Sequence, residues 1–284
     1  MFKAINNWFF GSTPIEEAMK QAKAAGFVGF EVCIGDGGPG SLGWQDGQGR
    51  CKEIAAAAKS IGIEISSVAS GLYWGTSLSS PDKVERDKAI VMTRCMLQQT
   101  AWLGAKHLLV VPANVGADFT NIAPVPYDEA YKLSLGSIKK AIKTAKKARV
   151  FLCVENVWNK FLYSPLELKA FVQAIDSKWA GVYFDPANAI LVGFPEHWIP
   201  ILGKLIKRVH VKDYDRAKPT FPAGFDLAFG TGSVNWPGVL AALKKIKYSG
   251  PLTAEYIPPH PPYDGDTAEA AKRVFADVTK TLKV

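Results

Sequence analysis

Short apolar runs alternate with longer segments of mixed polarity along almost the whole chain. The apolar runs are rich in β-branched and aromatic residues, which is typical of strands in a parallel sheet that is buried on both faces. The segments between them carry apolar residues at helical spacing, and several end on glycine, the usual C-cap residue. We predict strands at residues 2–10, 27–34, 63–70, 105–113, 150–157, 179–187, 205–213 and 251–257, and helices at residues 14–26, 51–62, 81–104, 128–148, 165–175, 194–203, 235–250 and 267–283.

These elements form eight successive strand–helix units within 284 residues. The repeat fits an α/β fold of the (β/α)8 TIM-barrel type, which typically takes about 250 residues. A doubly wound open sheet is the alternative, but it would be expected to carry a glycine-rich phosphate turn after its first strand. The sequence there is NNWFFGST, which is not such a turn. No stretch resembles a linker, so we predict one barrel domain over residues 1–284.

Acidic or imidazole side chains stand at or near the ends of four consecutive predicted strands. Glu155 follows the run FLCV, Asp185 lies between VYF and a proline, His210 lies in RVHVKD, and Glu255 follows LTA. The catalytic face of a TIM barrel is the C-terminal end of its strands, and consecutive strands are neighbours in the barrel. We therefore predict that these four side chains converge.

The chemistry of this set points to a metal ion. Clustered carboxylates would repel one another and take up protons unless a cation lay among them. Three oxygen donors and one imidazole, without a thiolate, favour a hard or borderline divalent ion such as Mn²⁺, Mg²⁺ or Co²⁺, with Zn²⁺ as a further alternative. The ion would polarise a substrate carbonyl and stabilise an enediolate, and Glu155 and Glu255 would move the proton. Taken singly, Asp185 is more typical of a helix N-cap and His210 of a packed core residue.

The formal net charge of +8 raises the question of an acidic partner. Much of the excess lies in residues 139–149 and 244–248, where apolar residues at helical spacing indicate amphipathic helices. We interpret both runs as solvated helix faces and predict no nucleic-acid partner. No apolar run approaches the roughly 20 residues of a membrane helix, the N-terminus lacks a secretory signal, and the four cysteines form no CxxC pair. We predict a cytoplasmic protein without a membrane partner.

Four segments carry a resemblance to a known family: VENVWN, FDPAN, HVKDYDR and AEY. They resemble the xylose isomerase-like barrels of sugar phosphate isomerases and epimerases, with the ketose 3-epimerases as the best-known comparison. The resemblance implies that Glu155, Asp185, His210 and Glu255 bind Mn²⁺ or a similar ion and that the two glutamates exchange the proton at the substrate carbon. It also implies that Arg216, six residues beyond the histidine, binds substrate.

Two departures from the family pattern concern the substrate. The ketose epimerases usually have a DTFH-like segment where this chain has Asp185-Pro-Ala-Asn188, so Asn188 stands where a histidine would contact substrate oxygens. Asn188 is a neutral donor and acceptor that cannot become a cation. Phe161 stands where the family has a further substrate-contacting glutamate. The resemblance to enzymes of free ketoses is therefore weaker than the resemblance to the metal site.

Several other residues have a functional and a structural interpretation. We predict that Lys212, Asn156 and Trp8 contact substrate together with Asn188. By alternation along the strand, Lys212 should share the face of His210 while Asp213 points away. The alternatives are a surface position for Lys212, orientation of a neighbouring ligand or a turn for Asn156, and plain packing for Trp8. Glu31 either bonds a substrate hydroxyl or caps the following loop. The remaining candidates favour structural roles: His107 at the start of a strand, His260 in a rigid surface loop formed by the proline-rich segment IPPHPPY, and a tight turn at GTGS, residues 230–233. The alternatives are a place at the mouth of the barrel for His260 and a phosphate site for the GTGS turn.

The function we predict is a metal-dependent isomerase or epimerase of a small sugar or sugar phosphate. The alternative is a metal-dependent lyase or dehydratase acting on a keto sugar or keto-inositol, resembling inosose dehydratase, which would be distinguished by loss of a leaving group. A DNA-repair nuclease related to endonuclease IV needs a histidine-rich three-metal cluster, and this chain has four histidines in all. A binding barrel without activity would not be expected to keep four ligands. Aromatic residues near the C-terminus would suit a homo-oligomer.

Overall fold

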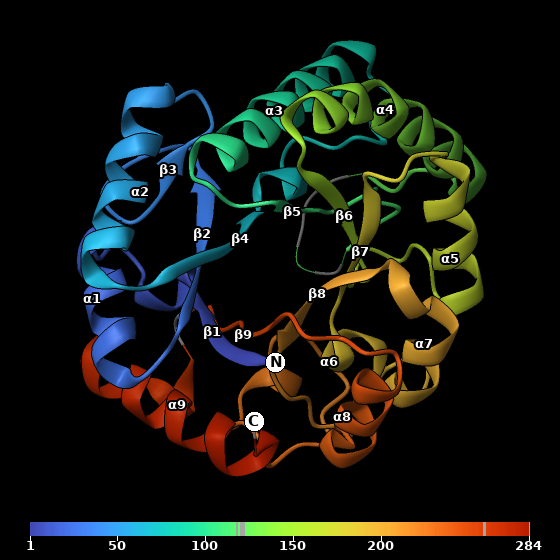
Figure 1. Ribbon diagram of the computed structural model, residues 1–284. Coiled ribbons are helices and arrows are strands. Elements are labelled where there is room, and N and C mark those ends of the chain that lie inside the picture. Colours follow the sequence, from blue (N-terminus) through green and yellow to red (C-terminus); the bar gives the residue numbers. More distant parts are fainter. Residues whose placement is uncertain (118, 120–122, 258–259, 284) are drawn as a thin grey trace.

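The computed structural model describes residues 1–117, 119, 123–257 and 260–283. Eight parallel strands form a closed barrel in these residues, with helices around it (Figure 1). The sheet order is β1-β9-β8-β7-β6-β5-β4-β2, and pairing of β1 with β2 closes the ring. The predicted TIM barrel is confirmed. Its strands are β1 (Phe2–Asn6), β2 (Gly29–Gly35), β4 (Glu64–Ser70), β5 (His107–Val110), β6 (Phe151–Glu155), β7 (Ala180–Phe184), β8 (Ile206–Val211) and β9 (Pro251–Ala254).

The outer ring consists of helices whose apolar faces pack on the barrel. In the long fourth helix, Ile138, Ala141 and Ala145 are buried while the lysines of the basic run 139–149 are exposed. This run is thus a solvated helix face, as its periodicity predicts. The helices that follow the barrel strands are α1 (Ile15–Ala25), α2 (Gln48–Ile61), α3 (Lys83–Trp102), α4 (Tyr127–Ala148), α5 (Pro165–Ala174), α7 (Pro195–Leu202), α8 (Trp236–Lys245) and α9 (Thr267–Leu282).

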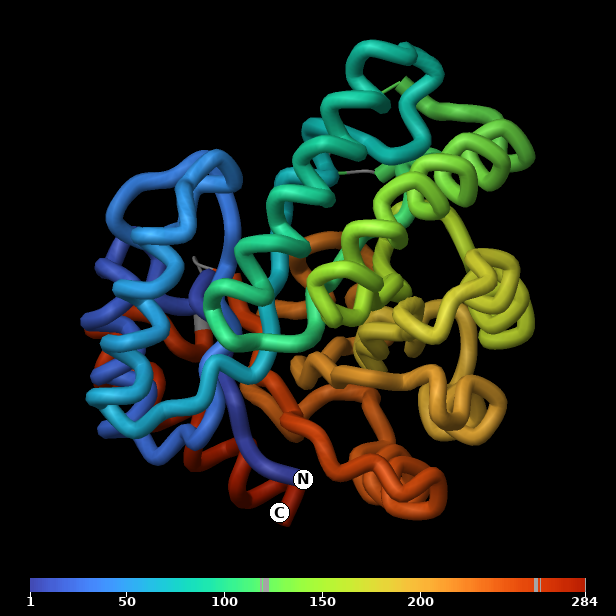
Figure 2. Tube along the Cα trace, turned by 45° about the horizontal axis from the view of Figure 1, so that its top comes forward, coloured from blue at the N-terminus to red at the C-terminus, as the bar shows by residue number. Residues whose placement is uncertain are grey.

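The ring of helices closes where the two ends of the chain meet. Helices α1 and α9 lie side by side in both views (Figures 1 and 2). The rings of Phe27 and Phe275 meet edge to face at 5.1 Å, and the Thr267 hydroxyl donates to the Gln21 side chain at 2.7 Å. The first and last units are therefore neighbours, as closure of the barrel requires.

Short elements account for the differences from the predicted pattern. The first predicted strand was wrong beyond Asn6: residues 7–10 form the 3-10 helix η1 (Asn7–Phe10), because pairing with β2 ends at Asn6 and Glu31. An apolar run has the same composition in either conformation, so periodicity does not separate them. Further short elements that the sequence did not indicate are β3 (Leu42–Gly43), α6 (Pro186–Ala189), η2 (Leu72–Trp74), η3 (Gly203–Leu205), η4 (Ala223–Phe225) and η5 (Pro261–Tyr263).

In the part of the chain described here, no helix has the length and apolarity to cross a membrane.

His107 opens β5 at the N-terminal face of the barrel, opposite the strand ends that carry the candidate site. Its buried ring stacks on Phe151 with the centroids 5.3 Å apart. Burial, reinforced by the positive charges of Arg208, Lys207 and Lys106, lowers the pKa of His107 to about 3. This placement agrees with the structural role predicted for it.

We expect His107 to make the fold sensitive to acid. Its pKa in the folded state lies below the unfolded value of about 6.5, so below that pH the unfolded chain binds the additional proton. The free energy of unfolding should fall by about 2 kcal/mol between pH 6.5 and about pH 5 on this account. Urea unfolding at both pH values should show that His107→Gln loses less stability than the wild type. His197→Gln, at an exposed histidine, is the control, and equal losses in all three proteins would contradict the argument.

Candidate functional site

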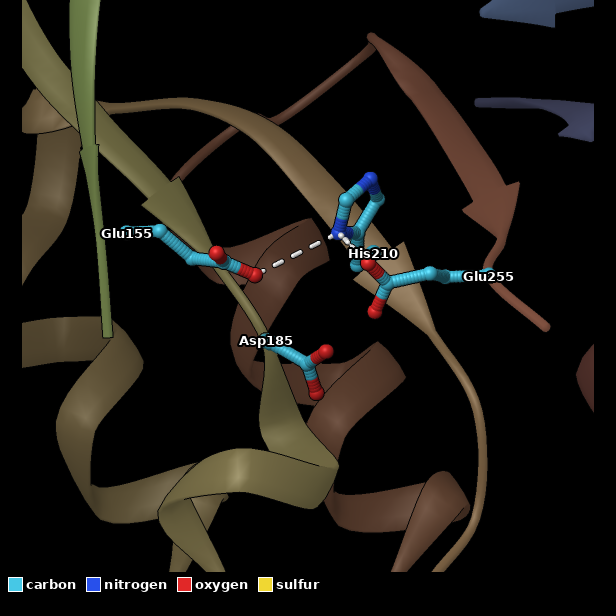
Figure 3. Close-up of side chains that lie close together, drawn as sticks. All are labelled: Glu155, Asp185, His210 and Glu255. Atoms are coloured by element: carbon cyan, nitrogen blue, oxygen red, sulfur yellow. Dashed lines mark ion pairs between the residues drawn. The ribbon is translucent and has the colours of Figure 1, made fainter. Parts of the chain in front are cut away.

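The four side chains predicted at strand ends meet at the C-terminal mouth of the barrel. Glu155 is the last residue of β6, Asp185 and Glu255 directly follow β7 and β9, and His210 lies in β8. Figure 3 shows all four pointing toward one centre. One potential ligand atom from each lies within 4.8 Å of the others, and all four residues are buried. Consecutive strands thus bring together groups that are up to 100 residues apart.

The two carboxylate oxygens of Asp185 have different partners. Oδ1 accepts hydrogen bonds from the backbone N–H groups of Ala187 at 2.8 Å and Asn188 at 3.0 Å, which caps helix α6. Oδ2 accepts a hydrogen bond from the ammonium group of Lys212 in the cluster. The N-cap and the cluster interpretations of Asp185 therefore hold together, because a carboxylate has two oxygens.

A buried glutamate orients His210. The Nε2 atom of His210 lies 2.8 Å from Oε1 of Glu31, so the imidazole donates a hydrogen bond to that carboxylate. Its Nδ1 faces the cluster, 3.5 Å from Oε1 of both Glu155 and Glu255. The other oxygen of Glu31 accepts from the hydroxyls of Ser67, at 2.8 Å, and Tyr183. A carboxylate behind a histidine is the usual partner of a metal-ligating imidazole.

Both roles predicted for Glu31 were wrong. It is the third residue of β2 and wholly buried inside the barrel, so it neither reaches a substrate hydroxyl nor caps the loop. One signal in the sequence could have found it. An acid in the middle of an otherwise apolar run needs a polar partner inside the fold, and the histidine of another strand is such a partner.

The donor set fits a divalent cation. Nδ1 of His210 is buried and makes no hydrogen bond within the described chain, although two carboxylates lie close to it. A metal ion at this centre would take that nitrogen together with oxygens of Glu155, Asp185 and Glu255, a combination that suits hard and borderline ions. Lys212 also enters the cluster, since its ammonium group donates to Asp185 and to Glu255.

The pKa values of the two glutamates in the cluster are shifted in opposite directions. Burial and the neighbouring Glu255 carboxylate raise the pKa of Glu155 to about 7, against the attraction of His210 and Lys212. Burial also acts to raise the pKa of Glu255, but the charges of His210 and Lys212 outweigh it and the pKa is lowered. For His210 the surrounding carboxylates outweigh burial and raise the pKa, so a metal ion at Nδ1 would displace a proton.

A cavity of about 390 Å³ opens above the cluster. Glu155 and Glu255 lie in its wall, and so do three residues predicted to contact substrate: Trp8, Asn188 and Lys212. His260 also lines it and is largely buried, so its predicted place in a surface loop was wrong. No periodic pattern in the sequence indicated the other aromatic residues of the wall, which include Trp74, Phe119, Phe221 and Phe225.

Asn156 holds two strand ends together. Its side-chain carbonyl accepts from the backbone N–H of Asp185 at 2.9 Å, and its side-chain amide donates to the Asp185 carbonyl at 2.8 Å. The side-chain amide of Asn188 in turn donates a hydrogen bond to the backbone carbonyl of Asn156 at 3.0 Å. Asn156 was predicted to contact substrate, but both ends of its amide are used by the backbone. These contacts favour a positioning role for Asn156, and its direct contact with substrate stays a prediction.

Arg216 lies outside the cavity wall. Its guanidinium group donates to the backbone carbonyls of Ile190 and Gly193 and stacks on the ring of Phe194. These contacts tie the loop after α6 to the loop after β8. A direct contact of Arg216 with substrate is thus not supported by its placement and stays a prediction. Phe161, which stands where the family has a substrate-contacting glutamate, is buried among aromatic rings, as expected for an apolar residue.

The GTGS turn is closed to a phosphate. The backbone N–H groups of Gly230, Gly232 and Val234 all donate to the carboxylate of Asp213, at 3.0, 3.1 and 3.2 Å. Asp213 points away from the cluster while Lys212 enters it, as the alternation along the strand predicts. The tight-turn interpretation is confirmed, because the groups that would bind a phosphate already hold a carboxylate.

The chain matches the model of one known protein family over most of its length. The family model of xylose isomerase-like TIM barrels matches residues 19–276. The chain belongs to this family. The resemblance seen in the four sequence segments is therefore confirmed.

Similar proteins cover most of the chain. A Haemophilus influenzae protein named L-ribulose-5-phosphate 3-epimerase is 26% identical over 246 residues, which are 84% of this chain and 82% of the relative. Among solved structures, an L-ribulose 3-epimerase has a TM-score of 0.80 at 19% identity, with 99% of this chain and 94% of that one covered. An Escherichia coli 3-keto-D-glucoside 4-epimerase has a TM-score of 0.79 at 16% identity, with 99% and 100% covered. These structural similarities show the fold.

Proposed function

We propose that the protein is a metal-dependent sugar isomerase or epimerase that moves a proton next to a carbonyl group through an enediolate. The observation that carries the proposal is the convergence of Glu155 and Glu255 on one point in the wall of the cavity. Relatives named as ketose and ketose-phosphate epimerases support the reaction class, and the comparison includes a keto-glucoside epimerase.

The residues of the cluster divide the work. A divalent ion, with Mn²⁺ as first choice over Mg²⁺, Co²⁺ and Zn²⁺, would supply a Lewis acid that stabilises negative charge on substrate oxygens. Glu155 and Glu255 would exchange the proton at the substrate carbon, with one accepting it and the other returning a proton from the other side. Lys212 holds Glu255 and Asp185 in place, and Trp8 and Asn188 face the substrate.

The outcome depends on how the two glutamates flank the carbon. With one on each face of the substrate, a proton removed from one side returns on the other, and the product is an epimer. With one glutamate in reach, the same site would carry out an aldose–ketose isomerisation or a β-elimination. The lyase alternative is kept for this reason, and the identity of the product decides between them.

Proton exchange in D₂O tests the proposal. The protein with added Mn²⁺ is incubated with ketoses, ketose phosphates and 3-keto sugars, and the products are followed by NMR. We expect deuterium at the carbon next to the carbonyl, in an amount that falls when EDTA removes the metal. An unsaturated product would indicate the lyase instead. Absence of exchange with the whole panel, in protein that binds one metal ion, would refute an epimerase of these sugars.

Other expectations rest on the sequence alone. A single domain over residues 1–284, a cytoplasmic location and a homo-oligomeric state stay predictions. The same holds for the absence of nucleic-acid and membrane partners.

A further inference from the structure

The cavity above the cluster has an aromatic wall that proton transfer at one carbon does not require. Five rings form a continuous chain, and each lines the cavity. The ring of Trp158 lies 5.0 Å from Phe225 and 6.0 Å from Phe221, Phe119 lies 4.5 Å from Phe221, and Trp74 lies 4.7 Å from Phe119. We call these five side chains the aromatic chamber.

The aromatic chamber joins the reaction centre directly. The ammonium group of Lys212 lies 5.4 Å from the ring centroid of Phe225 and also bonds Asp185 and Glu255. A substrate whose carbonyl lay at the carboxylates would therefore extend from Lys212 along the rings. The volume of about 390 Å³ falls in the range of roughly 300–1,000 Å³ typical of cavities that bury drug-sized ligands.

The charge of the wall disfavours a phosphate as the occupant. Among the described residues of the cavity wall, Lys212 is the one lysine or arginine, and its charge is already shared by two carboxylates. Asp226 adds a negative charge to the same wall. The residues outside the described part carry no lysine, arginine or histidine side chain. Lys160 lies in the wall of an adjoining, smaller cavity of about 180 Å³, which shares Phe119, Trp158 and Phe221 with the first. The GTGS turn is held by Asp213.

Polar side chains next to the aromatic chamber suit hydroxyl groups. His260 and Asp226 line the same cavity. Flat aromatic faces next to a few polar groups match a pyranose ring, which has an apolar face and a hydroxylated rim.

We propose that the aromatic chamber binds a second, uncharged sugar ring, so that the substrate is a glycoside of a keto sugar. The inference rests on the proposed function for the reacting ring and adds the class of the substituent. The reacting ring lies at the carboxylates, and the second ring packs on Phe221, Phe225 and Trp158.

Binding of unreactive sugars tests this inference separately from catalysis. The Mn²⁺-loaded protein is titrated by calorimetry with methyl β-D-glucoside, cellobiose, maltose and glucose 6-phosphate. We expect at least one disaccharide to bind about tenfold more tightly than the methyl glucoside, as an aromatic stacking surface of this kind provides. Phe221→Ala should abolish that advantage, and Trp158→Phe should reduce it, because a single phenyl ring offers a smaller stacking face than the indole.

One exposed phenylalanine serves as the control, and two outcomes would overturn the inference. Phe194 is exposed like Phe221 and lines neither cavity, so Phe194→Ala should keep the disaccharide preference. Equal affinity for methyl glucoside and both disaccharides would overturn the inference, as would tighter binding of glucose 6-phosphate than of either disaccharide. Deuterium exchange of a small free ketose in the same protein would still establish the proposed function, so the two failures are distinguishable.

Discussion

Glutamine in place of Glu155 or Glu255 should lower the rate of epimer formation by about 10²–10⁴-fold, the usual contribution of a positioned acid or base. The amide keeps the size of the side chain and one oxygen that can bind a metal ion, but it neither accepts nor donates a proton at working pH. Both residues lie in the cavity wall, and Oε1 of each lies 3.5 Å from Nδ1 of His210. Each variant should therefore lose epimer formation while it keeps its fold and still binds the ion.

The measurement is formation of the deuterated epimer, followed by NMR under saturating Mn²⁺, with metal content determined on the same samples. Glu64→Gln, at an exposed glutamate that begins β4, is the matched control and should form the epimer at the wild-type rate. Epimer formation at the wild-type rate in either Glu155→Gln or Glu255→Gln would show that the mechanism with two glutamates is wrong. A single active glutamate would then favour isomerisation or elimination at the same site.

Glutamine in place of Glu31 should weaken metal binding by about 10–100-fold, the range found when the partner of a metal-ligating histidine is removed. Glu31 accepts hydrogen bonds from His210, Ser67 and Tyr183 with its two oxygens. An amide has one acceptor oxygen, so one of these donors would face an N–H group. The imidazole would lose both its fixed orientation and the negative charge behind it.

Calorimetric titration with Mn²⁺ measures this effect on folded protein. Tyr183→Phe removes one donor to Glu31 and leaves the carboxylate in place, so it should weaken binding less than Glu31→Gln does. Glu53→Gln, at an exposed glutamate of α2, should leave metal affinity unchanged. Wild-type affinity in Glu31→Gln would show that His210 needs no carboxylate behind it, or that the ion binds elsewhere.

The barrel could be predicted from the chain because its elements are local. Apolar runs separated by helical periodicity mark each unit, and eight units in sequence leave few alternatives to a closed parallel sheet. The prediction failed at residues 7–10, where an apolar run continued past the last strand pairing as a 3-10 helix. A period of two residues over so short a run does not separate the two conformations.

The sequence by itself determined the barrel and the four residues at its mouth. Glu155, Asp185, His210 and Glu255 were found because each interrupts an apolar strand near its C-terminal end, and that end is the functional face of the fold. The tertiary structure alone decided what surrounds them. Glu31 meets His210 across 179 positions of the chain, and the aromatic chamber joins loops that no periodic pattern links. Such contacts depend on how strands and loops pack in space, and a local pattern of residues carries no information on that packing.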